Sequence, residues 1–167
     1  MNDINPIVKK YSYFKSSSYL MLFILISVVS IVLLKKLDAL LNFKNFQSIL
    51  SIGVGITLLA LGSILRFWAG TLFYQKDLKI ISFKPQMHLI QSGPYRFSRN
   101  PLYVGIITIF SGLALIFGSI SGVIASVLIF LIWNSQINSE EKLLETKFGN
   151  EYLEFKNKVP RWLKIKL

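Results

Sequence analysis

Long apolar runs separated by short polar segments dominate this chain. A membrane-spanning helix needs roughly 17 to 20 apolar residues, and four runs approach or exceed that length: residues 18–34, 48–74, 101–117 and 120–137. The third and fourth are joined by Gly118-Ser119, which predicts a tight turn and an antiparallel helical hairpin. The pattern therefore predicts an all-α, polytopic membrane bundle with about four spans. We expect residues 1–167 to form one domain.

The chain after the fourth run, residues 138–167, has an amphipathic pattern. Large apolar side chains recur there at spacings of four, four and three: Leu144, Phe148, Tyr152 and Phe155. This spacing places them on one face of a helix. Gly149-Asn150 should kink or break that helix, with Asn150 able to cap a second piece. We expect the amphipathic helix to lie on the cytoplasmic surface or to fold under the bundle.

The distribution of charge predicts the orientation. The net charge is +11 and 53% of the residues are hydrophobic. With four spans, fifteen Lys and Arg residues fall on the side of the N-terminus, residues 75–100 and the tail, against three on the other side. This excess marks the first side as cytoplasmic, with basic segments facing anionic lipid. A nucleic-acid binder would concentrate its charge in one patch, whereas here three segments share it.

The first apolar run also has the charge order of a signal peptide. No small-residue cleavage site follows, and the run ends at Lys35-Lys36, so we expect a retained span. Cysteine is absent, which excludes disulfides, thiolate metal sites and cysteine nucleophiles. His88 is the single histidine, so we expect no metal site.

Three charged residues stand near the predicted membrane boundary. Glu140 and Glu141 lie one helical turn before Leu144, where a carboxylate is costly unless it meets a cation, a hydroxyl or a ligand. They could instead complement the start of the tail helix, with Ser139 as its cap. Arg66 interrupts the second run. It either snorkels to the headgroups, pairs with one of these carboxylates, or binds an anionic ligand group.

The segment SGPYRFSRNPLY, residues 92–103, is polar and conformationally restricted at the start of the third run. Gly93-Pro94 predicts a turn, and Pro101 suits the first turn of a helix. The free N–H groups of that turn attract anions, two arginines add positive charge, and two tyrosines supply hydroxyls and flat faces. The segment is either a cradle for a small molecule with a carboxylate and an aromatic base, or a basic loop that binds lipid headgroups.

The sequence HLIQSGPYRFSRNPLYVG, followed about 35 residues later by EEKLLETKFGNEYLEFKNKVP, resembles the isoprenylcysteine carboxyl methyltransferase family. The related phospholipid N-methyltransferases share the general design. LRFWAGTLF, Leu65 to Phe73, is similar to an Arg-x-Trp-Ala stretch of that family, so the resemblance covers about residues 65–160. It implies an integral membrane enzyme that uses S-adenosylmethionine without a Rossmann domain, and no G-x-G-x-x-G follows a predicted strand here.

The resemblance also implies where the cofactor lies, namely on the cytoplasmic side between the loop, the hairpin ends and the tail. Carried over by position, the implied cofactor-binding residues are Met87, His88, Leu89, Ile90, Gly93, Tyr95, Asn100, Pro101, Leu102, Tyr103 and Glu140. The residues expected to be catalytic are Arg99, Glu140 and Glu141. Those expected to contact the substrate are Arg66, Trp68 and Gln136.

Three departures from the family pattern bear on cofactor and substrate. Asn100 stands where the family often has histidine, and both can donate a hydrogen bond. Gln136 stands where an arginine would meet a substrate carboxylate, and Met87 replaces a histidine. The last two weigh against a prenylated-cysteine carboxylate and leave methyl transfer to a lipophilic acceptor from the bilayer. The alternatives are a phospholipid N-methyltransferase and a non-catalytic membrane adaptor with a lipid-binding basic tail.

Overall fold

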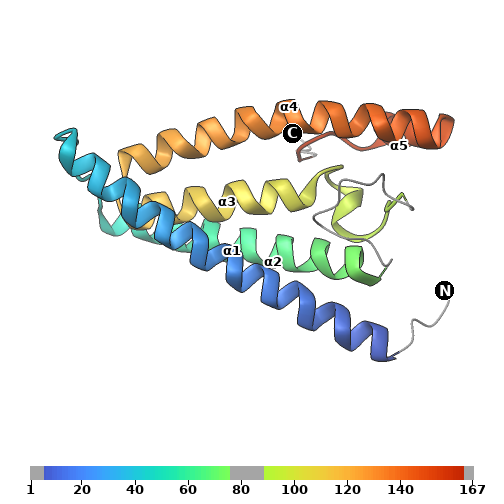
Figure 1. Cartoon of the computed structure of the whole chain (residues 1–167), viewed down its shortest axis with the longest axis horizontal. Coiled ribbons are helices and arrows are strands. Elements are labelled where there is room, and N and C mark those ends of the chain that lie inside the picture. Colours follow the sequence, from blue (N-terminus) through green and yellow to red (C-terminus); the bar gives the residue numbers. More distant parts are fainter. Residues whose placement is uncertain (1–5, 76–88, 164–167) are drawn as a thin grey trace.

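The computed structural model describes residues 6–75 and 89–163, and helices are the only regular elements in these ranges. Figure 1 shows their arrangement. In chain order they are α1 (Pro6–Leu40), α2 (Ile49–Gln75), the short 3-10 helix η1 (Gly93–Arg96), α3 (Pro101–Ile116), α4 (Ile120–Phe148) and α5 (Asn150–Lys158). The prediction of an all-α bundle is confirmed for the described residues.

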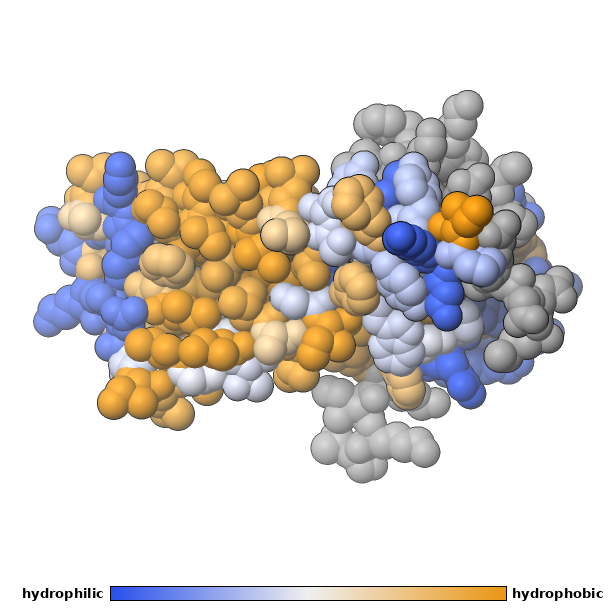
Figure 2. All heavy atoms as spheres, turned by 90° about the horizontal axis from the view of Figure 1, so that it is seen from below, coloured by the Kyte–Doolittle hydropathy of each residue, from blue (hydrophilic) through white to orange (hydrophobic). Residues whose placement is uncertain are grey.

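Three of the helices are long and apolar enough to cross a membrane. They are α1, α2 and α4, with 35, 27 and 29 residues. The third predicted span, residues 101–117, corresponds to α3, an apolar helix of 16 residues, which is shorter because Pro101 begins it and the turn at Gly118 follows it. Figure 2 shows a broad apolar surface bounded at one end by a hydrophilic strip and at the other by a largely hydrophilic region. This division suits a molecule with its middle in lipid.

Glycines bring α2 and α3 into backbone contact. Gly55 faces Gly112, and Gly62 faces Gly105. A Cβ added to Gly62 would lie 2.9 Å from the carbonyl oxygen of Gly105, and one added to Gly55 would lie 2.6 Å from that of Gly112. Small residues at such crossings let helices approach closely, which drives association where lipid surrounds them. Gly53, by contrast, has nothing within 4 Å of its added Cβ.

The predicted hairpin between α3 and α4 is confirmed, and the C-terminal end of α1 holds it. Gly118 adopts a φ of 59°, and the Ser119 hydroxyl accepts a hydrogen bond from the Gly122 N–H at the start of α4. Asp38, buried near the end of α1, accepts hydrogen bonds from the Ser119 hydroxyl at 2.6 Å and the Ser121 N–H at 2.8 Å. From this end α1 and α4 diverge (Figure 1).

Two helices extend beyond the apolar runs that predicted them. α1 begins at Pro6 rather than near residue 18, and α4 continues past residue 137 to Phe148. Backbone hydrogen bonding does not stop where side chains become polar, so hydropathy underestimates both lengths. Ser139 therefore lies inside α4 and is not a cap.

The predicted break after α4 occurs at Gly149, which has a φ of 53° and precedes α5. Asn150 is the first residue of α5 and not its cap, so that part of the prediction is wrong. All four residues of the predicted apolar stripe pack into one cluster with residues near the C-terminal end of α2. We call it the tail cluster; its buried members are Ala69, Phe73, Ile90, Tyr95, Tyr152, Phe155 and Val159, and Leu72, Leu89, Leu102, Leu144 and Phe148 pack against it.

Candidate active site

The carbonyl groups of the segment after α5 accept hydrogen bonds from residues at the start of α3 and so hold that start in place. The Arg99 N–H donates to the carbonyl oxygen of Pro160 at 2.9 Å. The carbonyl oxygen of Arg161 accepts from the Ser98 hydroxyl at 3.1 Å and from the Asn100 side-chain amide at 3.4 Å. Ser98 is fully buried in this contact. The tail therefore fixes the turn that leads into the N-terminus of α3.

Glu141 is a buried carboxylate between two guanidinium groups. Its Oε1 lies 3.0 Å from Nη2 of Arg99, and its Oε2 lies 2.8 Å from Nη2 of Arg161. The Glu141 and Arg99 side chains are only 5% and 8% exposed. Arg161 also donates to the side-chain oxygen of Asn134 at 3.2 Å. Since an isolated buried charge is costly, these pairings join α4, the tail and the start of α3 into one unit.

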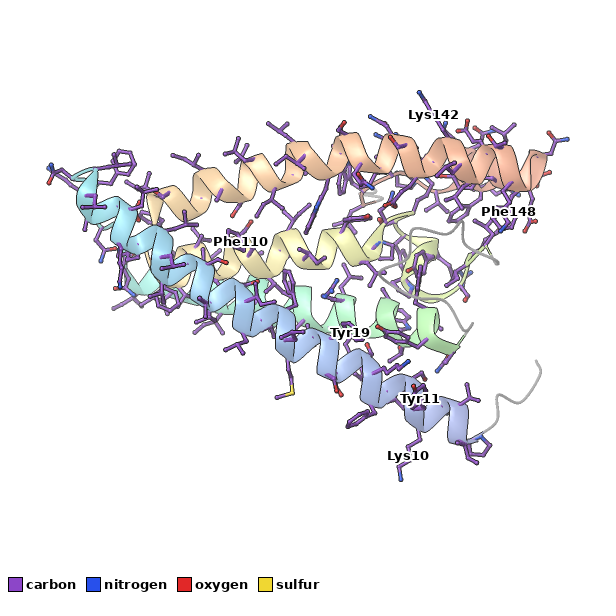
Figure 3. The ribbon with its side chains drawn as sticks, viewed as in Figure 1. Lys10, Tyr11, Tyr19, Phe110, Lys142 and Phe148 are labelled. Atoms are coloured by element: carbon purple, nitrogen blue, oxygen red, sulfur yellow. The ribbon has the colours of Figure 1, made fainter. Side chains whose placement is uncertain are left out.

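Glu140 faces a different neighbour because consecutive helical residues point about 100° apart. Its Oε1 accepts a 2.6 Å hydrogen bond from the hydroxyl of Tyr103, on the first turn of α3. The Tyr103 ring packs edge-on against Trp133, with centroids 5.3 Å apart. Lys142 points away from the bundle (Figure 3). Oε2 of Glu140 has no hydrogen-bond partner among the described residues, so it can accept from a ligand.

The apolar side of the site is the tail cluster. Leu89, Ile90 and Leu102 meet in it with Tyr95, whose ring stacks on Phe73 with centroids 6.4 Å apart. The Tyr95 hydroxyl is buried and has no hydrogen-bond partner within the part of the chain that the structure describes. Burial raises the pKa of Tyr95 well above its usual value. The phenol therefore stays neutral at physiological pH.

Burial also raises the pKa of Tyr152 of α5, to about 12, so this phenol is neutral as well. Gly93 contributes a close approach: it has a φ of 59°, and an added Cβ would lie 2.5 Å from the Leu72 side chain and 3.2 Å from Trp68 Nε1. Only glycine fits both the conformation and the contact.

The structure places the predicted site residues in three groups. Tyr103 meets Glu140 and Arg99 meets Glu141, while Leu89, Ile90, Tyr95 and Leu102 share the tail cluster. Gly93 lies against Trp68, Asn100 hydrogen-bonds the tail, and Pro101 is buried at the start of α3. Met87 and His88 lie outside the described residues. The ligand-binding roles of all these residues stay predictions.

The predicted substrate-contact residues have unlike environments. Gln136 is exposed on α4, and Trp68 is 45% exposed on α2. Arg66 is buried, and neither glutamate pairs with it, because Glu140 binds Tyr103 and Glu141 binds two other arginines. The considered pairing of Arg66 with these carboxylates is therefore wrong.

Sequence reasoning missed Arg161, Asn134 and Trp133. Arg161 is one of seven basic residues in the tail, and its spacing does not distinguish it from the others. The only local signal is Pro160, which cannot continue a helix and so indicates that the chain turns before Arg161.

The family model described as phospholipid methyltransferase matches residues 50–151, which run from α2 to the start of α5. The chain belongs to the phospholipid methyltransferase family. The match includes α3, the acidic pair and Arg99, and it ends before Arg161.

Two similar proteins support the resemblance of this phospholipid methyltransferase family member to the isoprenylcysteine methyltransferases. Protein-S-isoprenylcysteine O-methyltransferase B of Arabidopsis thaliana is 28% identical over 109 residues, which cover 64% of this chain and 55% of the relative. The Schizosaccharomyces pombe protein-S-isoprenylcysteine O-methyltransferase is 30% identical over 105 residues, covering 61% and 44%. The chain thus spans about half the length of these curated relatives.

Proposed function

We propose that this protein transfers a methyl group from S-adenosylmethionine to a lipophilic acceptor, in the manner of an isoprenylcysteine carboxyl methyltransferase. One observation carries the proposal. Two motifs far apart in the sequence meet at the start of α3, where Tyr103 binds Glu140 and Arg99 binds Glu141. Family membership supplies the reaction class, and this junction supplies a place for the methyl donor.

The residues at the junction fit the chemical groups of S-adenosylmethionine. The free carboxylate oxygen of Glu140 would accept hydrogen bonds from the donor ammonium, with Tyr103 holding that carboxylate in place. Leu89, Ile90 and Leu102 would cover the apolar faces of the adenosine. Asn100 and Pro101 would lie at its polar end. Arg99 and Glu141, which neutralise each other, would act as positioning residues.

The bound sulfonium would supply the activated methyl group, so the protein's contribution is binding and orientation. The acceptor's lone pair would attack the methyl carbon directly as the carbon–sulfur bond breaks. A carboxylate already has such a lone pair and requires no general base, whereas an ammonium headgroup would first have to lose a proton, for example to water. The apolar tail cluster would keep water away from the reacting groups.

The orientation in the membrane follows from charge. In the proposed arrangement α1, α2, α4 and the shorter α3 all lie in the bilayer, and both termini, the site and α5 lie on the cytoplasmic side. The excess of basic residues on that side supports this orientation. The many exposed apolar side chains of α1, α2 and α4 support lipid contact. An amphiphilic acceptor would then enter from the bilayer.

A methyl-transfer assay with two acceptors tests the proposal. Purified protein in detergent is given S-adenosylmethionine with a labelled methyl group, together with an S-prenylated cysteine or with phosphatidylethanolamine. We expect label in a lipid product with the wild type and not with Glu140→Gln. Alkali releases the label from a methyl ester but not from an N-methyl amine, so it separates carboxyl methylation from the phospholipid alternative. Absence of label in both acceptors and in a membrane lipid extract would favour the non-catalytic adaptor.

A further inference from the structure

Arg66 is a buried guanidinium. It lies in the apolar helix α2, its residue is 8% exposed, and its Nη1 has no hydrogen-bond partner among the described residues. The guanidinium carbon lies 4.9 Å from the centre of the Phe23 ring of α1. No carboxylate in residues 6–75 and 89–163 forms an ion pair with it. A cationic side chain in such a place is costly unless it meets an anion or serves a function.

The other arginines of the described chain do not share this state. Arg99 and Arg161 both pair with Glu141, and Arg96 is exposed on η1. The fold also makes room for Arg66, since a Cβ on Gly105 of α3 would lie 2.8 Å from the Cβ of Arg66. Arg66 is thus enclosed by α1, α2 and α3, and no carboxylate in the described part of the chain pairs with it.

A second unmatched donor lies nearby. The Tyr95 hydroxyl of η1 is buried and, like Nη1 of Arg66, has no hydrogen-bond partner in residues 6–75 and 89–163. Tyr95 packs in the tail cluster with Ala69, which lies about one helical turn after Arg66 on α2, and the Arg66 charge opposes the rise that burial causes in the Tyr95 pKa. Two buried donors from different elements, without an acceptor between them, match an anionic group that could accept from both.

We propose that Arg66 and Tyr95 bind the acidic group, a carboxylate or a phosphate, of the amphiphilic methyl acceptor. The inference rests on the proposed function, which identifies this amphiphile as the methyl acceptor. Arg66 lies on an apolar helix whose neighbour Trp68 is 45% exposed on the outer surface, so an alkyl or prenyl chain can lie along α2 while its acidic end reaches Arg66. This site would also offset the absence of an arginine at Gln136.

The donor's own carboxylate is the competing source of such an anion, and the experiment separates the two. Hexadecanoate, hexadecyl phosphate, neutral hexadecanol and inorganic phosphate are titrated into detergent-solubilised protein, and binding is followed by calorimetry. S-adenosylmethionine is titrated in parallel. The variants are Arg66→Gln and Tyr95→Phe. The matched control is Lys36→Gln, which removes an exposed basic residue near the C-terminal end of α1.

We expect wild type and Lys36→Gln to bind both anionic amphiphiles, and hexadecanol and inorganic phosphate at least about tenfold more weakly. Arg66→Gln should weaken the anionic amphiphiles by about tenfold or more, and Tyr95→Phe severalfold. Arg66→Gln should bind S-adenosylmethionine as the wild type does. Tyr95→Phe removes only a hydroxyl and keeps the ring in the tail cluster. This variant can therefore test the anion site even if Arg66→Gln does not fold.

Three results would overturn the inference: wild type does not prefer the anionic amphiphiles to hexadecanol, both variants retain full affinity for them, or Arg66→Gln loses affinity for S-adenosylmethionine instead. The last result would assign Arg66 to the donor. A wild type that binds the anionic amphiphiles but not S-adenosylmethionine would contradict the proposed function and leave the anion site standing. The relative affinity of hexadecanoate and hexadecyl phosphate identifies which acid group the site favours.

Discussion

The hydroxyl of Tyr103 donates a 2.6 Å hydrogen bond to Oε1 of Glu140, across the gap between α3 and α4. The two helices leave the Gly118 turn as a hairpin, and this bond connects them again at the opposite end. It fixes one carboxylate oxygen and leaves the other for a ligand. The proposed donor site depends on both oxygens of Glu140, because Tyr103 holds Oε1 and leaves Oε2 open to a ligand.

Tyr103→Phe tests whether that bond orients Glu140. The ring and its contact with Trp133 remain, while the carboxylate loses its donor. We expect the dissociation constant for S-adenosylmethionine to rise by roughly ten- to a hundredfold, as for loss of one hydrogen bond to a charged group. Tyr11→Phe, at an exposed site on α1, is the control and should change nothing. Unchanged affinity in Tyr103→Phe would show that the hydroxyl does not position Glu140 for the donor.

Glu141→Gln should lower the stability of the whole junction. The variant leaves two arginines without a counter-charge, one of them with a side chain only 8% exposed. Breaking a buried ion pair costs about 3 kcal/mol or more, and we expect a loss of that size in the free energy of unfolding in detergent. Glu154→Gln, which removes an exposed pair with Lys158, should have no measurable effect. Equal stability of the two variants would contradict a structural role for the Glu141 cluster.

Sequence reasoning found the two halves of this junction but not how they combine. The adjacency of Glu140 and Glu141 suggested similar roles, yet helical geometry sends one side chain to Tyr103 and the other to the arginines. Arg161 could not be identified because its partner lies twenty positions earlier, and only the turn after α5 brings the two together. Such pairings depend on tertiary structure, which local patterns do not encode.

The glycine contacts between α2 and α3 give a stability test with an internal control. Gly62→Ala places a Cβ 2.9 Å from the backbone of Gly105, and overpacking of this kind costs about 1–3 kcal/mol. Gly53→Ala lies on the same helix with open space around it, so it should be neutral or stabilise by up to about 1 kcal/mol. Thermal unfolding in detergent measures both. A Gly62→Ala protein as stable as Gly53→Ala would show that α2 and α3 do not pack this closely.

The hydrogen bonds of Asp38 to the start of α4 should affect stability without affecting the donor site. Asp38→Asn weakens the hydrogen bonds from the Ser119 hydroxyl and the Ser121 N–H at the start of α4. We expect a loss of about 1–3 kcal/mol in unfolding free energy, with donor affinity within twofold of wild type. A large loss of donor affinity in a folded Asp38→Asn protein would mean that the two ends of the bundle are coupled.

The hydrophobic pattern predicted the hairpin and the helical class because both follow from local sequence. Gly118 supplies the positive φ of the turn, and apolar runs leave no alternative to helices in lipid. The pattern failed at helix ends. α4 passes through the polar stretch from Asn134 to Ser139 without interruption, since its backbone hydrogen bonds are independent of side-chain polarity. Hydropathy therefore indicates where lipid ends but not where a helix ends.

Calorimetric titration of S-adenosylmethionine into the detergent-purified wild type and Glu140→Gln tests the central claim most directly. The account predicts saturable binding of one donor per chain in the wild type, and at least about tenfold weaker binding in Glu140→Gln with unchanged thermal stability. Absence of saturable binding to a folded wild type, or equal affinity in the two proteins, would contradict a donor site between the start of α3 and the acidic pair of α4.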